Sequence, residues 1–192
     1  PFTTAEMRDI VNALKSKGQY DFLRFVLFIY YSWARPVEIC RLLVEDINLT
    51  EGTIRFRAGK TKNGKAAFVQ IVPPLKDLLL EMKLDQYPAD HFLFSIDNLY
   101  LPGRKNISPD SHVRRWQKYI KDTKTGLGLN KEMYGMKHTG NIHYLLNNKG
   151  NTNLKWQQMQ NRHGSATMTE RYIRKLGAFF IEVGNINFHE FK

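Results

Sequence analysis

The spacing of apolar residues predicts a mainly helical chain. Residues 3–17 repeat apolar positions at a helical period, with Thr3 and Glu6 at capping-box spacing and Gly18 after the end. The following segment, DFLRFVLFIYYSWA, is apolar on nearly all sides, which predicts a buried helix. Further helices are predicted over residues 36–46, 73–85, 111–123, 133–150, 153–160 and 167–177.

One stretch of the chain has the pattern of strands instead. Residues 52–58 and 66–72 read as two strands, and Asn63-Gly64 between them is a strong hairpin signal. The segment GKTKNGKA also approaches a phosphate-binding loop, but Ala66 lacks the hydroxyl that holds magnesium, and a strand follows where a helix is needed. We therefore predict an α+β fold, mainly α with a small antiparallel sheet, and no nucleotide site.

Composition is that of one globular domain over residues 1–192, because 42% of the residues are hydrophobic and there are no repeats or linkers. No apolar run approaches the 18 or so residues of a membrane span, and the N-terminus lacks the pattern of a signal peptide. Cys40 is the single cysteine, which rules out an internal disulfide and fits a reducing compartment. We expect a cytoplasmic protein without membrane partners.

Basic residues gather in the second half of the chain. Residues 1–99 hold 13 Lys and Arg against 12 Asp and Glu, whereas residues 100–192 hold 16 against 6. This asymmetry suggests a polyanionic partner, because neutralising phosphates releases counterions and favours binding whatever the base sequence. A membrane surface is the weaker interpretation, since no basic helix has an exposed apolar face. A merely soluble basic surface remains the alternative.

The same half of the chain contains a candidate nucleophile. Paired carboxylates or histidines that would hold a divalent metal are not apparent, so phosphate chemistry here would need side-chain cations. Tyr172 follows His163 by nine residues, and Arg162, Arg171 and Arg174 lie close by in sequence. Neighbouring cations favour the phenolate of a tyrosine, which is otherwise a poor nucleophile at neutral pH. A tyrosine on a short helix is, however, more often a packing or surface residue.

Four segments in order change this balance. They are ARPVEICRL, KTKNGK, YGMKHTGNIHYLL and RHGSATMTERY. Together they resemble the catalytic domain of the tyrosine recombinases, or phage-type integrases, over residues 3–175. That family has a hydrophobic-R-x-x-E box, a hairpin lysine, an H-x-x-R-H-T box, and a G-H box with its tyrosine nine residues beyond the histidine.

The resemblance implies a site-specific recombinase that joins DNA through a 3′-phosphotyrosine intermediate without metal, ATP or other cofactor. Tyr172 would attack the phosphate while Arg35 and Lys137 hold its oxygens and His163 hydrogen-bonds to it. Lys62 would be the general acid, with Lys60 as the competing choice. The remaining roles would be a contact from Tyr134, structural support from Glu38 and His138, and DNA binding by Lys60, Lys65, Arg162, Arg171 and Arg174.

Two departures bear on activity. Tyr134 stands where the family has histidine, and Lys137 where it has the second catalytic arginine. Lysine keeps the charge but loses the planar fork, which by analogy with a lost oxyanion donor would cost about 10²- to 10³-fold in rate if nothing compensates. Related mobile-element integrases tolerate KHT in this box, so we favour an active enzyme. The alternatives are a DNA-binding module that lost cleavage and a type IB topoisomerase.

The family also implies how the chain would work with partners. Its members bind double-stranded DNA, and four protomers assemble on two duplexes, whereas we expect this chain to be a monomer in solution and associated with the nucleoid in the cell. An N-terminal DNA-clamp domain precedes the catalytic domain in most members, and we expect it to be absent from this chain. The apolar tail GAFFIEVGNINFHEF would dock on a neighbour or on its own domain.

Overall fold

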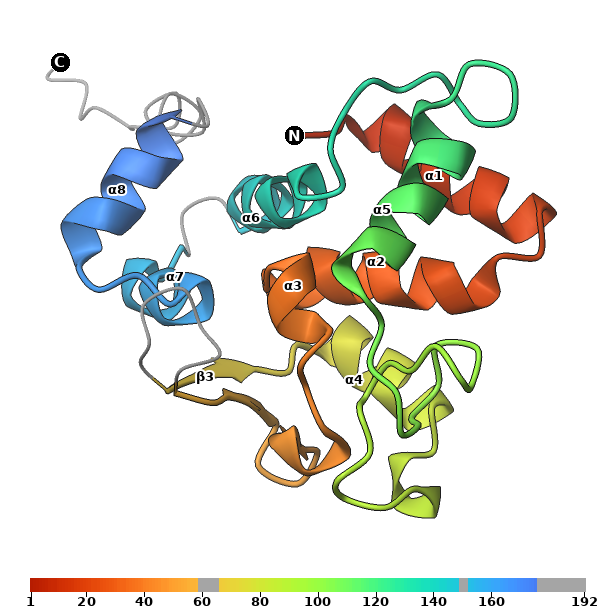
Figure 1. Cartoon of the computed structure of the whole chain (residues 1–192). Helices are drawn as coiled ribbons and strands as arrows, with labels where there is room; N and C mark the ends of the chain where they lie inside the picture. The colour runs from red at the N-terminus through yellow and green to blue at the C-terminus, as the bar shows by residue number, and fades with distance from the viewer. Residues whose placement is uncertain (59–65, 149–151, 176–192) are drawn as a thin grey trace, which may run out of the picture.

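The computed structural model describes residues 1–58, 66–148 and 152–175, and it has the predicted fold class. Helices dominate, and a small sheet lies at one side of the molecule, next to α7 (Figure 1). No helix within the described ranges is long and apolar enough to cross a membrane. The α-helices are α1 (Thr4–Ser16), α2 (Tyr20–Ser32), α3 (Pro36–Ile39), α4 (Pro73–Glu81), α5 (Pro109–Trp116), α6 (Gly135–Asn147), α7 (Leu154–Asn161) and α8 (Ala166–Lys175).

Helix α2 is the centre around which α1, α4 and α6 pack, as its apolar sequence predicted (Figure 1). Its phenylalanines are fully buried, and Phe25 and Phe28 both meet Phe94 edge to face at 5.3 and 5.4 Å between ring centroids. Aromatic edge-to-face pairs of this kind add to the stabilisation from burial alone. Helix α1 begins with the predicted capping box between Thr3 and Glu6.

The sheet has three antiparallel strands in the order β1-β2-β3. Strands β2 (Thr53–Phe56) and β3 (Ala67–Gln70) confirm the predicted hairpin pairing, with Thr53 opposite Gln70 and Phe56 opposite Ala67. The Asn63-Gly64 turn lies outside the described residues. Strand β1 (Ile47–Asn48) was not predicted, because two residues are too few to show a period.

The predicted helix over residues 36–46 is wrong in length. Helix α3 ends at Ile39, and a 3-10 turn (Val44–Asp46) occupies the end of the segment. The Asp46 carboxylate accepts the Leu43 amide at 3.0 Å and the guanidinium groups of Arg55 and Arg57 at 3.0 and 2.8 Å. These polar contacts tie the segment to the sheet, and they override its helical spacing of apolar residues. Two further departures are a 3-10 turn (Leu84–Gln86) and a π-helical turn (Gln117–Lys121) at the ends of predicted helices.

Helix α6 lies unusually close to α2, and Gly140 makes this possible. A Cβ at this position would stand 2.1 Å from the Tyr30 carbonyl oxygen and 2.8 Å from Trp33 Nε1. Both contacts are far inside van der Waals distance, so any larger residue would push the two helices apart. The close contact between the two helices therefore fixes the position of the other α6 residues relative to α2.

We expect Gly140→Ala to lower the free energy of unfolding by about 1–3 kcal/mol through overpacking, although alanine favours helices more than glycine does. Urea unfolding followed by circular dichroism would measure the change. Gly164→Ala is the matched control, because a Cβ there meets nothing within 4 Å, and its effect should stay within about 0.5 kcal/mol. Equal stability of both variants would contradict the close approach of α2 and α6.

Candidate functional site

The site begins where α2 passes into α3. Trp33 ends α2 in the left-handed conformation (φ 53°), and Arg35 is the extended residue before Pro36 starts α3. Glu38, one turn into α3, reaches back to Arg35, accepting its backbone amide at Oε2 and its Nη1 at Oε1, both at 3.0 Å. The guanidinium of Arg35 is therefore held by the buried carboxylate of Glu38 on the short helix α3.

Arg162, directly after α7, binds the same carboxylate. Its Nη2 donates to Glu38 Oε2 at 2.6 Å, its guanidinium lies 4.2 Å from the centroid of the Phe56 ring, and its side chain is only 7% exposed. Burial would raise the pKa of Glu38, but the charge of Arg162 and the bonds from Arg35 hold it below its usual value. Glu38 is thus an ionised bridge between two arginines.

Lys137 brings a third cation to this cluster from α6. Its side chain is 2% exposed, and burial, followed by repulsion from Arg162 and Arg35, lowers its pKa to about 7 against the pull of Glu38. Arg35, Lys137 and Arg162 together exceed the single negative charge of Glu38. Such a surplus suits an anion, because an opposite charge would relieve the repulsion among the three.

His163 lies in the turn between α7 and α8, beside the three cations. Its pKa is lowered to about 4 by burial first and then by Lys137, Arg35 and Arg162, so the ring is neutral at pH 7. One ring nitrogen, Nδ1, stands 3.0 Å from the hydroxyl of Thr169 on α8. This contact links the cluster to the helix that carries Tyr172.

Helix α7 is anchored to the sheet by a side-chain amide. The Gln160 amide accepts the Gln70 backbone N–H at 2.9 Å and donates to the Gln70 carbonyl at 3.0 Å, as a neighbouring strand would. Trp156 Nε1 adds a bond to the Gln70 side chain at 2.6 Å. These bonds fix the position of β3 relative to α7 and to the residues that follow α7.

A second pair of amides joins α7 to α6. Asn141 and Asn161 are buried and exchange hydrogen bonds, with Asn161 Nδ2 to Asn141 Oδ1 at 2.7 Å and the reverse bond at 3.1 Å. Asn141 lies one turn after Lys137 on α6, and Asn161 directly precedes Arg162. Lys137 on α6 and Arg162 directly after α7 are thus placed by buried hydrogen bonds between the two helices.

The remaining predicted residues lie around the cluster or outside the described part. Tyr134 is 36% exposed, and its ring meets that of the half-buried His138 edge to face at 4.7 Å. Arg171 and Arg174 are exposed on α8, which packs against α7. Tyr172 belongs to α8, but its side chain lies outside the described part. Lys60, Lys62 and Lys65 also lie outside the described residues.

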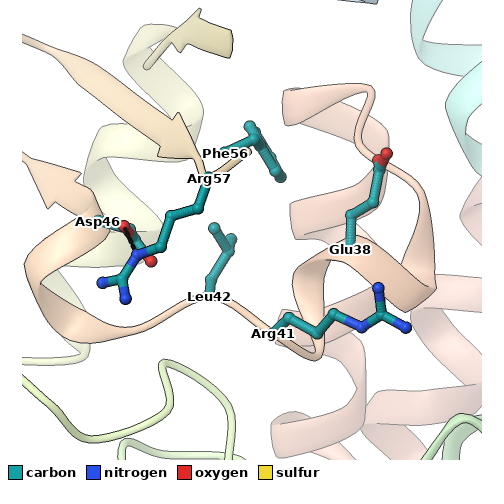
Figure 2. Close-up of a pocket in the computed structure, with 6 residues that line it drawn as sticks. All are labelled: Glu38, Arg41, Leu42, Asp46, Phe56 and Arg57. Carbon is teal, nitrogen blue, oxygen red and sulfur yellow. Dashed lines mark hydrogen bonds and ion pairs between the residues drawn. The ribbon is translucent and has the colours of Figure 1, made fainter. Parts of the chain in front are cut away.

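Among the hollows of the described surface, one lies against the cluster and another lies apart from it. A cavity of about 10 Å³ has Glu38 and Arg41 on one side and the Asp46–Arg57 ion pair on the other (Figure 2). It has room for about one water molecule. A larger hollow of about 480 Å³ lies between α1, α2 and α6, lined in part by Tyr30 and His143, and shares no residue with the cluster.

The described residues also include no group of three or more His, Cys, Asp and Glu that could hold a metal ion. Glu38 is bonded to two arginines, and the neutral ring of His163 has positively charged neighbours that would repel a metal cation. The cluster is therefore suited to bind an oxyanion through its guanidinium and ammonium groups.

Sequence reasoning assigned Arg162 to the DNA surface and did not foresee its bond with Glu38. A DNA contact for Arg162 stays a prediction, but the structure shows a buried side chain. A signal was present, because the G-H box that this segment resembles has glycine where the chain has Arg162. The backbone there has φ 57°, a conformation that glycine adopts most readily.

Comparisons with known proteins identify the fold through structure alone. No family model and no curated protein matches the chain. The XerA recombinase superposes with a TM-score of 0.66 at 19% identity over 97% of this chain. The Tn1549 transposon integrase, solved with transposon right-end DNA, gives 0.65 at 14% identity over 96%. XerH recombinase bound to its difH substrate gives 0.57 at 16% identity over 96%.

These similarities show that the chain has the fold of tyrosine recombinase catalytic domains, as its motifs predicted. The chain covers 65% of the length of the XerA chain, 66% of the Tn1549 integrase chain and 52% of the XerH chain. Identities below 20% establish the fold and leave the chemistry to be argued from the residues themselves.

We predict that buried Lys137 makes stability depend on pH. Its pKa is about 7 in the fold against an ordinary 10.5, so between these values the unfolded chain binds more protons. The free energy of unfolding should therefore rise with pH across this window. Urea titrations of wild type and Lys137→Met at pH 7 to 10 would isolate the effect. As the pH rises, the free energy of unfolding of wild type should increase relative to that of the variant. Parallel pH curves for the two proteins would contradict it.

Proposed function

We propose that this chain is the catalytic domain of a site-specific DNA recombinase or integrase that cleaves and rejoins DNA through a 3′-phosphotyrosine, without metal or ATP. The observation that carries the proposal is the cluster of Arg35, Lys137, Arg162 and His163 around one carboxylate, in a chain with the recombinase fold. The cluster unites three of the four motif segments, although Arg35 and Arg162 are 127 residues apart.

A phosphodiester supplies the anion that the cluster lacks. Arg35 is 29% exposed and has donors beyond the Nη1 bonded to Glu38, so it would bind one non-bridging oxygen. Lys137 is 2% exposed in the free protein and would pair with the other oxygen, as a point charge, once the bound phosphate reaches it. Because the phosphate's negative charge favours the protonated ammonium, DNA binding would raise the pKa of Lys137 and take up a proton near neutral pH.

Tyr172 is the proposed nucleophile. Position 172 is three residues beyond Thr169 on α8, so the two positions share a helix face, and the Thr169 hydroxyl contacts His163. After the phenol has lost its proton to solvent, which nearby cations favour, the phenolate oxygen would form a bond to phosphorus as the bond to the 5′-oxygen breaks. The phosphodiester energy is then kept in the protein–DNA link, which removes any need for ATP.

Proton transfers complete the proposed step. Lys62 on the hairpin would donate a proton to the departing 5′-oxygen, with Lys60 as the competing choice. His163 is neutral at pH 7, so its imidazole can both accept and donate hydrogen bonds at the phosphate. Tyr134 would be an auxiliary contact beside it, and His138 and Glu38 would support the cluster. A freed 5′-hydroxyl from a partner strand reverses the same chemistry.

The proposed working state is a tetramer on two DNA duplexes, formed from monomers in solution. Exposed Arg171 and Arg174 on α8, with Lys60 and Lys65 of the hairpin, would contact the DNA backbone. The neighbours named as complexes with transposon DNA and with a difH substrate support double-stranded DNA as the partner. A mobile element or a chromosome-resolution system, and a cytoplasmic place at the nucleoid, fit such an activity.

The test is capture of a covalent adduct on suicide DNA. A pool of nicked duplexes, randomised on both sides of the nick, loses its short 5′-hydroxyl fragment after cleavage and so traps the phosphotyrosine. Wild type should accumulate an adduct that survives denaturing electrophoresis, and Tyr172→Phe should abolish it. Tyr20→Phe is the matched control, since Tyr20 is 60% exposed on α2 and should react as wild type.

Two other outcomes would replace the proposal. A shift of DNA mobility without any adduct in wild type would identify a binding module that lost cleavage. Adducts without sequence preference, together with relaxation of supercoiled plasmid, would identify a type IB topoisomerase. Sequencing the captured duplexes separates these results from site-specific cleavage.

A further inference from the structure

We propose that Arg162 is a positioning residue, which locks Glu38 in the orientation that aims the Arg35 guanidinium at the bound phosphate. The role deepens the proposed function and rests on it. It differs from a DNA contact, because the side chain would act through Glu38 and Arg35 and would not touch the DNA itself.

The geometry joins the two arginines through both oxygens of one carboxylate. Glu38 Oε1 accepts Arg35 Nη1 at 3.0 Å, while Oε2 accepts the Arg35 backbone amide at 3.0 Å and Arg162 Nη2 at 2.6 Å. Pulling on Oε2 therefore fixes the rotation of the carboxylate and, with it, the direction of Arg35. A carboxylate held only by its own short helix would lose that second anchor.

Arg162 itself is fixed from several sides. Its guanidinium lies over the Phe56 ring, 4.2 Å from the ring centroid, and its side chain is only 7% exposed. Within the described residues, its Nε and Nη1 are buried and have no hydrogen-bond partner. Because these two donors are left unsatisfied, the one strong bond to Glu38 accounts for the direction of the side chain.

The backbone and the local charges both oppose an arginine at this position. Residue 162 has φ 57°, where a side chain is strained and glycine is not. Burial lowers the pKa of Arg162, and Arg35 repels it, although Glu38 attracts it. Arg162 also contributes to the lowered pKa values of Lys137 and His163. A residue placed against strain and repulsion is best explained by what it does to Glu38.

Arg162→Gly gives the sharpest test, because glycine suits φ 57° and removes only the side chain. We expect it to lower the rate of adduct formation at saturating suicide DNA by about 10- to 100-fold, while the Kd for that DNA changes less than threefold. Arg162→Lys should recover part of the rate, since an ammonium can still bond to Glu38. The probe is the nicked duplex that wild type captures.

A second measurement needs no cleavage. In the free protein, the NMR order parameter of the Arg35 Nε–H bond should fall in Arg162→Gly and return toward wild type in Arg162→Lys. The matched control is Arg115→Lys, since Arg115 is another arginine held by a carboxylate, that of Asp21, and it stacks on Phe22. This control should leave both the saturated rate and the order of Arg35 unchanged.

The outcomes separate this role from its rivals. A weaker Kd with an unchanged saturated rate would make Arg162 a direct DNA contact and overturn the proposal. Unchanged order of Arg35 in the glycine variant would also overturn it. If the glycine variant fails to fold, the lysine variant decides through the same two measurements, the saturated rate relative to Kd and the order parameter of Arg35. If wild type forms no adduct, the proposed function fails, whereas the order of Arg35 still tests the positioning.

Discussion

A buried carboxylate that binds two arginines is the interaction on which the site depends. Glu38 is 4% exposed, and removing a charge from water is costly unless partners and hydrogen bonds replace the lost hydration. Arg35 and Arg162 supply those bonds, so the loss of either arginine would remove part of what compensates the buried charge of Glu38. Residues 35–38 and residue 162 are thereby tied at one point, and the amide contacts of α7 with β3 and α6 hold that point in place.

The same arrangement leaves the site with more positive than negative charge. Lys137 is buried beside the two arginines, and its pKa is lowered by burial first and then by repulsion from Arg162 and Arg35. Without bound phosphate, the three cations repel one another, and a bound phosphate would relieve that repulsion. Sites prepared for charged ligands commonly store such strain, and the surrounding core must be stable enough to bear it. Here that core is the aromatic packing of α2.

Much of this structure could be predicted because its signals are local. The capping box at Thr3, the apolar run of α2 and the strands of the hairpin follow from spacing alone, and the ordered motifs gave the fold. The short α3 could not be predicted, because it ends through contacts of Asp46 with distant arginines. Nor could the burial of Arg162, since pairing with Glu38 across the fold leaves no periodic trace in the sequence.

The Gln160 amide has one further consequence, for how copies of the chain could join. By bonding to both backbone groups of Gln70, it occupies the outer edge of β3 there, and the opposite edge strand, β1, is two residues long. Exposed strand edges are the usual templates for unwanted sheet extension between molecules. At Gln70 and along β1 the described sheet therefore offers little free edge for such extension, which suits a sheet that serves as a rigid mount for the site.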